Sequence, residues 1–419
     1  MKTPAFAGGS LPLHYSLALP SILSQPPQLF TAMELAHRAT ILTPSLTLSI
    51  DSKAKAMKAE GIDVCSFGAG EPDHDTPDHI KAAAMASLDG GFTKYTPSSG
   101  IPELRQAIAD KFKNDNGIDY KPSQIIVSNG AKHSCYNAIL ATCQADDEVI
   151  IPAPFWLSYP EMVRLAGAEP VIVHTKQEND WKMTPEEFES AMTPRTKMVI
   201  LNTPGNPTGS VYTKEELEAL VEIAATEDIL ILSDEIYEKL TYDGAKHVSI
   251  ASLSKTAYDL TITVNGFSKA YAMTGWRLGY LGAPEAIAKA IDAIQSHSTS
   301  NPCSFAQQGG LAALRGDQSA VEEMRAEFDL RRQYIVQRLR DIPKVTVVEP
   351  KGAFYVLANI SALGLTSSNF SERLLSKHHV AVVPGVAFGD DRTVRLSYAT
   401  GLDTIKKGLD RIEEFCKSL

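Results

Sequence analysis

The chain has 419 residues, 44% of them hydrophobic and 21% charged, and its formal net charge is -10. This size and composition predict a globular protein with a large core that is divided into two domains. The acidic balance and the lack of a long basic run argue against a nucleic-acid surface. No stretch reaches the roughly 18 apolar residues that a transmembrane helix needs, so we expect no membrane span.

The cysteines are odd in number and none has the spacing of a metal or redox pair. The five are Cys65, Cys135, Cys143, Cys303 and Cys416. Free thiols are typical of a reducing compartment, so we expect a cytoplasmic protein. The ten histidines are dispersed, and the adjacent His378 and His379 have no companion ligands, so we expect no metal site.

Residues 1–32 differ from the rest of the chain, since they contain one lysine and no acidic residue. Their longest apolar run is short and broken by Pro20, which excludes the core of a secretory signal. An organelle transit peptide would be richer in arginine. We expect a disordered extension, with ordinary sequence beginning at Met33.

The next part of the chain, residues 33–75, is predicted to pack with the smaller domain. It contains a helix over residues 46–58, and Ser45 and Thr47 lie near its start, where a hydroxyl can cap backbone donors. A short strand at Cys65 then ends in a glycine-rich turn. There Gly70 has no side chain, so backbone can approach a ligand closely.

Residues 76–305 are predicted to form the large domain. A strand over residues 124–128 runs into a helix, so Gly130 and Ala131 fall at a helix N-terminus, where free N–H groups attract an anion. The next strand, residues 148–152, leads to Trp156. Core packing is the usual fate of a tryptophan, and stacking on a flat ligand is the alternative.

Three further apolar runs cover residues 197–201, 229–232 and 260–264, and a helix over residues 214–225 separates the first two. Such runs predict βαβ units with a mostly parallel sheet that helices cover on both faces. In these sheets ligands bind beyond the carboxyl ends of the strands, and most of the candidate site residues of this chain lie at such an end.

Residues 306–419 are predicted to form a smaller α/β domain. It begins with a long charged helix over residues 318–340. Strands then cover residues 344–348, 352–357, 380–384 and 394–398, with a helix over 368–375 and a closing helix. No Gly/Ser-rich linker separates the two domains, so we expect the break to fall inside a long helix.

Lys269 is the candidate catalytic residue. It follows a strand among glycine, serine and alanine, which suits a Schiff base with pyridoxal phosphate better than solvation. A surface lysine in a glycine-containing loop is the alternative. Arg277 offers a fork of donors for a phosphate, which the helix start at Gly130 and Ala131 would also bind.

A cofactor of this kind needs a carboxylate at its pyridine nitrogen, so that the ring accepts electrons. Asp234, at the end of its strand, suits this role, although a helix N-cap is the alternative for this residue alone. Donors at the ring hydroxyl tune the cofactor, and Asn206 and Tyr237 are candidates.

Four motifs resemble class I aminotransferases and occur in family order. They are the lysine signature of residues 265–279, Asn206-Pro-Thr-Gly, Ser233-Asp-Glu-Ile-Tyr237 and Arg395-Leu-Ser-Tyr-Ala399. From Met33 onward the chain is similar to the bacterial-type aspartate aminotransferases of that class, subgroup Ib. The resemblance implies the type I fold of pyridoxal-phosphate-dependent transferases, with a mostly parallel central sheet in α/β/α layers and a smaller α/β domain.

By that resemblance Lys269 is the Schiff-base lysine and Asp234 the partner of the pyridinium nitrogen. Asn206 and Tyr237 would contact the ring oxygen, and Trp156 would stack on the ring. The resemblance also places Tyr95 at the cofactor phosphate of the neighbouring subunit, which implies a homodimer with shared active sites.

The resemblance assigns substrate contacts as well. Arg395 would bind the α-carboxylate in a bidentate pair, with the Gly70 backbone nearby. Lys132, helped by Thr47, would bind the distal carboxylate of aspartate or glutamate. A lysine that serves the phosphate or the solvent is the alternative for Lys132.

The implied activity is a ping-pong transfer from L-aspartate to 2-oxoglutarate, giving oxaloacetate and L-glutamate. The alternative within the class is a glutamate or aspartate–prephenate aminotransferase that makes arogenate. A lyase on the same fold is disfavoured by the pair Lys132 and Thr47. A non-catalytic regulator that binds pyridoxal phosphate usually carries a DNA-binding domain, and residues 1–32 are too short and too uncharged for one.

Overall fold

The computed structural model describes residues 35–43 and 46–419. The chain divides into two parts, Met1–Thr40 and Ile41–Leu419. The described residues of the first part form a short helix, α1 (His37–Thr40), in which the Thr40 hydroxyl donates to the His37 carbonyl at 2.8 Å. The disorder predicted for residues 1–32 lies outside the described residues.

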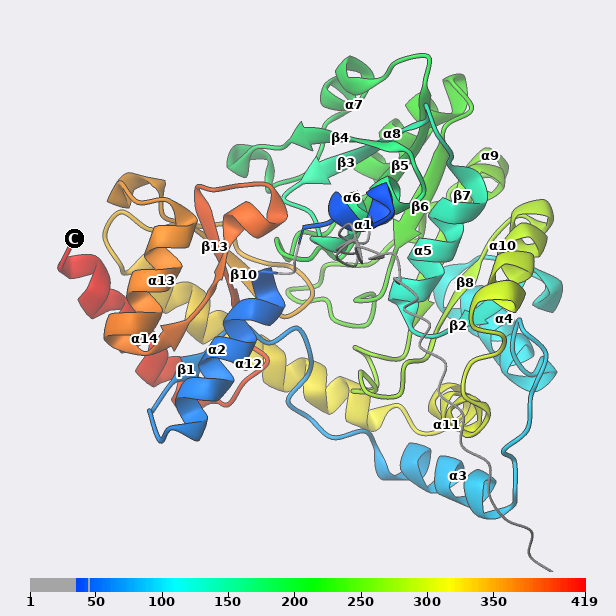
Figure 1. Ribbon diagram of the computed structural model, residues 1–419, viewed down its shortest axis with the longest axis horizontal. Coiled ribbons are helices and arrows are strands. Elements are labelled where there is room, and N and C mark those ends of the chain that lie inside the picture. Colours follow the sequence, from blue (N-terminus) through cyan, green and yellow to red (C-terminus); the bar gives the residue numbers. More distant parts are fainter. Residues whose placement is uncertain (1–34, 44–45) are drawn as a thin grey trace, which may run out of the picture. The chain divides into compact units, whose positions relative to one another are not determined.

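A large, mainly parallel sheet organises the second part, as the sequence predicts (Figure 1). Its strands lie in the order β2-β8-β7-β6-β5-β3-β4, and only β8 runs antiparallel to its neighbours. Their bounds are β2 (Ile125–Ser128), β3 (Glu148–Ala153), β4 (Glu169–His174), β5 (Thr196–Asn202), β6 (Leu230–Asp234), β7 (Thr261–Gly266) and β8 (Gly279–Gly282). Strands β4 and β8 were not predicted from the sequence. The short β8 has a glycine at each end, which gives little β signal.

Side chains alternate between the two faces along these strands, as strand geometry requires. Ile151, Ile200 and Leu232 share a core with residues of α5, α6 and α10. Ile150 and Val199 face the other way and share a core with residues of α7 and α8. The bounds of these helices are α5 (Ala131–Thr142), α6 (Ser158–Leu165), α7 (Pro185–Ala191), α8 (Lys214–Thr226) and α10 (Glu285–Ser298). The sheet is therefore buried on both faces.

A smaller antiparallel sheet has the order β12-β13-β10-β9, and β1 pairs separately with β11. The bounds are β1 (Cys65–Ser66), β9 (Thr346–Val347), β10 (Tyr355–Asn359), β11 (Val380–Ala381), β12 (Val383–Pro384) and β13 (Thr393–Ser397). The prediction of one strand over residues 380–384 was wrong. Its two halves pair with different partners, β1 and β13, and Val382 lies between the two ladders.

Among the remaining helices, those over residues 46–59, 319–340, 367–378 and 402–417 agree with predicted helices, whereas those over residues 78–89, 255–260 and 304–315 were not predicted. Their bounds are α2 (Leu46–Ala59), α3 (Asp78–Asp89), α4 (Pro102–Asn116), α9 (Lys255–Leu260), α11 (Ser304–Arg315), α12 (Ser319–Arg340), α13 (Ser367–His378) and α14 (Leu402–Lys417). Leu260 ends α9 instead of beginning a strand. Among the described residues no helix combines the length and apolar character that crossing a membrane requires. The domain divisions after residues 75 and 305 stay predictions.

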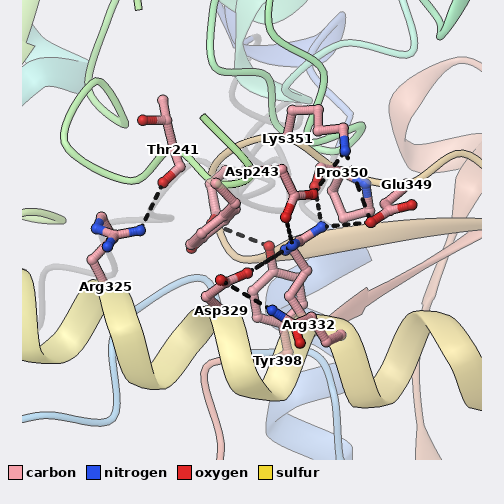
Figure 2. A network of polar contacts seen from close by, with 12 residues as sticks. Thr241, Asp243, Arg325, Asp329, Arg332, Glu349, Pro350, Lys351 and Tyr398 are labelled. Atoms are coloured by element: carbon pink, nitrogen blue, oxygen red, sulfur yellow. Dashed lines mark hydrogen bonds and ion pairs between the residues drawn. The ribbon is translucent and has the colours of Figure 1, made fainter. Parts of the chain in front are cut away.

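A buried ionic network attaches α12 to the chain around the small sheet (Figure 2). The Arg332 side chain is fully buried, and its guanidinium binds Asp243 at 2.8 Å, Asp329 at 2.7 Å and Glu349 at 3.0 Å. The backbone N–H of Tyr242 also donates to the Lys351 carbonyl at 3.0 Å. One arginine thus joins α12, the segment that follows β6 and the segment that precedes β10.

Candidate active site

A cavity of about 730 Å³ opens beyond the carboxyl ends of the parallel strands. Asn202 ends β5 and Asp234 ends β6, and both line this cavity. The predicted site residues that line it are Gly70, Ala131, Lys132, Trp156, Asn206, Asp234, Tyr237, Lys269, Arg277 and Arg395. The structure therefore brings together ten residues that the sequence analysis selected from across the chain.

Lys269 follows β7 and is placed as a reactive amine. Its Nζ donates to the Gly70 carbonyl at 2.5 Å. Burial lowers the pKa of Lys269 to about 8, against the opposing negative charge of Glu71. A lysine with this pKa presents a much larger share of neutral, nucleophilic amine near neutral pH than an exposed lysine does.

Asp234 is a buried carboxylate, 4% exposed. Its Oδ2 accepts from the Tyr159 hydroxyl at 2.7 Å and lies 3.8 Å from the Cys135 thiol. Its Oδ1 accepts from the Ile236 backbone N–H at 3.2 Å. Burial raises the pKa of Asp234, and the hydrogen bonds from Tyr159, Ile236 and Cys135 act in the opposite direction. The sequence analysis missed Tyr159 and Cys135.

The start of α5 and Arg277 together form a candidate anion site. Gly130 precedes the helix with a φ of +86°, and no side chain caps the helix there. The positive φ favours glycine here, and without a Cβ the Arg277 guanidinium packs directly against Gly130. Arg277 itself has a φ of +52°, and its Nη1 donates to the Thr274 carbonyl at 2.9 Å. The helix N–H groups and the guanidinium together suit a phosphate.

Arg395 lies in β13 and is 3% exposed. It donates to Asn206 Oδ1 at 3.0 Å and to the Gly68 carbonyl at 3.1 Å, and its guanidinium lies 4.4 Å from the Tyr355 ring centroid. Its Nε is buried without a hydrogen-bond partner. No carboxylate of the described residues pairs with it. A buried guanidinium with no carboxylate partner and an unpaired Nε–H suits a carboxylate ligand.

Four aromatic residues also line the cavity: Trp156, Tyr159, Tyr237 and Tyr355. The Tyr237 and Tyr355 hydroxyl oxygens lie 3.0 Å apart, so Tyr355, which the sequence analysis did not select, fixes the position of Tyr237. Trp156 packs edge-to-face with Tyr159, with ring centroids 5.1 Å apart. Lys132 Nζ lies 4.9 Å from the Trp156 ring centroid and thus places a second cation in the cavity.

Comparison with known proteins identifies the family. A family model described as aminotransferase class I and II matches residues 62–412. The chain belongs to the class I and II aminotransferases. An aspartate aminotransferase of Bacillus subtilis (strain 168) is 50% identical over 388 residues, which cover 91% of this chain and 99% of that protein.

Two other relatives of this aminotransferase are informative. An aspartate/prephenate aminotransferase of Cereibacter sphaeroides is 47% identical over 387 residues, covering 90% of this chain and 97% of the relative. The structure of Thermus thermophilus aspartate aminotransferase with maleate is 43% identical, has a TM-score of 0.88 and covers 92% of this chain and all of that one (100%). These matches confirm the predicted fold class.

Two predicted site residues of the aminotransferase, Gly130 and Tyr95, are not among the residues that line the cavity. Gly130 lies behind it against Arg277. Tyr95 is 91% exposed, so its predicted role at a neighbouring subunit stays a prediction. Thr47 falls in α2, but its side chain lies outside the described residues.

Proposed function

We propose that this aminotransferase transfers the amino group of L-aspartate to 2-oxoglutarate and uses pyridoxal phosphate as its cofactor. The observation that carries this proposal is Arg395, a buried guanidinium without an acidic partner among the described residues, in the same cavity as the cationic Lys132. Two cations suit the two carboxylates of a dicarboxylic substrate. The names of the relatives and the maleate of the Thermus thermophilus structure agree with a dicarboxylate.

The residues of the cavity fit the cofactor. Lys269 would hold its aldehyde carbon, Asp234 would face its ring nitrogen, and the α5 start with Arg277 would bind its phosphate. The close approach of the Arg277 guanidinium to Gly130, at the start of α5, supports the phosphate assignment. Pyridoxal phosphate, when bound, supplies an electron sink for the substrate Cα.

Each side chain then has a definite task. Arg395 binds the α-carboxylate and thereby orients the Cα–H bond toward Lys269. The Lys269 amine, with its pKa lowered to about 8, takes the proton from Cα and later returns one. Asn206 and Tyr237 would donate to the ring oxygen, and Tyr355 fixes the Tyr237 hydroxyl from the small sheet. Trp156 would cover one face of the ring.

The proposal includes a homodimer in a reducing compartment, the cytoplasm. Tyr95, 91% exposed, is free to reach the phosphate site of a second copy. All five cysteines are free thiols, which agrees with that location.

A second candidate activity uses prephenate as the amino acceptor. The observation that favours it is the same pair of cations, because prephenate also carries two carboxylates. The relative from Cereibacter sphaeroides is named aspartate/prephenate aminotransferase.

An absorbance titration tests the proposal. The purified protein is loaded with pyridoxal phosphate, and its spectrum is followed after addition of aspartate and then of an acceptor, with the Lys269→Ala variant as the control. We expect aspartate to convert the cofactor to its amine form, and 2-oxoglutarate to restore the original spectrum. Restoration by prephenate at an equal or higher rate would favour the second candidate. A cofactor spectrum that aspartate leaves unchanged would refute both.

A further inference from the structure

The carboxylate of Asp234 is bound from behind by two buried donors that the proposed mechanism does not use. We propose that Tyr159 and Cys135 are positioning residues, which orient Asp234 toward the cavity and keep it ionised, and so set the protonation of the cofactor's ring nitrogen. This inference rests on the proposed function, because it concerns the same cofactor.

The geometry fixes both oxygens of the carboxylate. Tyr159, 2% exposed, donates to Oδ2 at 2.7 Å, and the fully buried Cys135 places Sγ 3.8 Å from the same oxygen. The Ile236 backbone N–H donates to Oδ1 at 3.2 Å. With a donor on each oxygen, the carboxyl group cannot rotate without breaking a hydrogen bond. A second orientation would leave buried polar atoms unpaired.

The two side chains can act only as donors. Burial raises the pKa of Tyr159 and that of Cys135 well above their ordinary values, and the negative charge of Asp234 adds to the effect. Both groups therefore remain protonated beside the carboxylate. Their hydrogen bonds lower the pKa of Asp234, whereas burial and the neighbouring Glu235 raise it. Removal of a donor would make Asp234 more basic, so that it would take the proton from the ring nitrogen.

The two donors come from elements that form other parts of the site. Ala131 begins α5 at the anion site, and Cys135 lies on the same helix one turn later, facing Asp234. Tyr159, at the start of α6, packs edge-to-face against Trp156, the residue that would cover the ring. Two short stretches of chain, at the starts of α5 and α6, therefore fix the positions of the anion site, Trp156 and the Asp234 carboxylate relative to one another.

Four variants test the proposal: Tyr159→Phe, Cys135→Ala, the conservative Cys135→Ser, and the control Tyr120→Phe. Tyr120 is also buried, and its hydroxyl lies 3.1 Å from Thr263 Oγ1, outside the cavity. Each protein is loaded with pyridoxal phosphate labelled with ¹⁵N at the ring nitrogen. The ¹⁵N chemical shift is followed against pH, and kcat and KM are measured with aspartate.

We expect Tyr159→Phe to move the ¹⁵N shift toward the unprotonated value and to lower kcat by roughly tenfold or more, with KM changed by less than about threefold, since one hydrogen bond to a charged group is lost. Cys135→Ala should act in the same direction by about two- to threefold, because a thiol is a weak donor. Cys135→Ser should restore the wild-type shift, and Tyr120→Phe should keep it.

An unchanged ¹⁵N shift in both Tyr159→Phe and Cys135→Ala would overturn the proposal, even where kcat falls, because such a loss would be structural. If Tyr159→Phe does not fold, the comparison of Cys135→Ala with Cys135→Ser decides alone. Failure of the proposed function is distinguishable, since the wild-type protein would then bind no labelled cofactor or transfer no amino group.

Discussion

Asn206 and Arg395 are 189 residues apart in the chain, yet Arg395 donates a hydrogen bond of 3.0 Å to Asn206 Oδ1. Asn206 follows β5 of the large sheet, whereas Arg395 lies in β13 of the small sheet. The contact brings residues from the two sheets into one cavity. A substrate carboxylate bound by Arg395 is therefore held by the small sheet and presented to residues that follow strands of the large one.

Arg395→Lys should weaken the α-carboxylate contact for both amino acids of the reaction. The lysine keeps the charge but loses the planar fork of donors and the stacking on Tyr355. We expect kcat/KM for aspartate and for glutamate to fall about 10- to 100-fold, which corresponds to roughly 1.5–3 kcal/mol for a hydrogen bond to a charged group. Arg392→Lys is the control, because Arg392 pairs with Asp390 outside the cavity. Equal kcat/KM in the two variants would contradict the assignment.

Lys132→Met should change substrate selectivity. If Lys132 binds the distal carboxylate, kcat/KM should fall at least tenfold for aspartate and stay within about twofold for alanine, which has no distal carboxylate. The measurement is the ratio of the two kcat/KM values, with the exposed Lys121→Met as the control. If Lys132 serves the phosphate instead, the two values would fall together and the cofactor would bind more weakly.

Much of this site could be predicted because its residues follow apolar strands in a recognisable order. Lys269 and Asp234 each lie at or just beyond the carboxyl end of a strand, and that position needs only local pattern to predict. Tyr159 and Cys135 could not be found in this way. Cys135 lies 99 residues from Asp234 in the chain, and only the packing of α5 and α6 on the sheet brings the three groups together.

The same limit explains the errors in the fold. Residues 380–384 form one apolar run, and nothing local shows that its halves pair with β1 and β13. In the sequence Arg332 is one of many charged residues on a long helix, but folding buries it completely between Asp329 of the same helix and two carboxylates from outside that helix, Asp243 and Glu349. Strand pairing and buried ion networks depend on contacts between segments, whereas periodicity describes only single segments.

The depressed pKa of Lys269 predicts how cofactor attachment depends on pH. Only the neutral amine attacks an aldehyde, and the pKa of this lysine lies at about 8 in the folded protein. The neutral fraction therefore rises as the pH passes upward through about 8, and the rate of pyridoxal phosphate uptake by the apoprotein should rise with it. The negative charge of Glu71 raises this pKa, so Glu71→Gln should move the midpoint to a lower pH. A midpoint near the ordinary lysine value would contradict the burial of the amine.

Arg332→Met should destabilise the fold more than any exposed arginine variant. Its guanidinium is fully buried among Asp243, Asp329 and Glu349 (Figure 2). It also lies 5.1 Å from the Tyr242 ring centroid. Removal of the cation leaves three carboxylates close together without their common partner. We expect the free energy of unfolding to fall by about 3–5 kcal/mol, measured by urea denaturation.

Arg340→Met is the matched control for that measurement. Arg340 pairs with the same Glu349, at 3.0 Å, but its side chain is 47% exposed. Exposed ion pairs contribute little, so this variant should lose less than about 1 kcal/mol. The Arg332 network contacts the segment that follows Tyr237 and the segment that precedes Tyr355. Arg332→Met should therefore also weaken cofactor binding, whereas Arg340→Met should leave it unchanged. Equal losses of stability in the two variants would show that burial of the network contributes nothing beyond a surface ion pair.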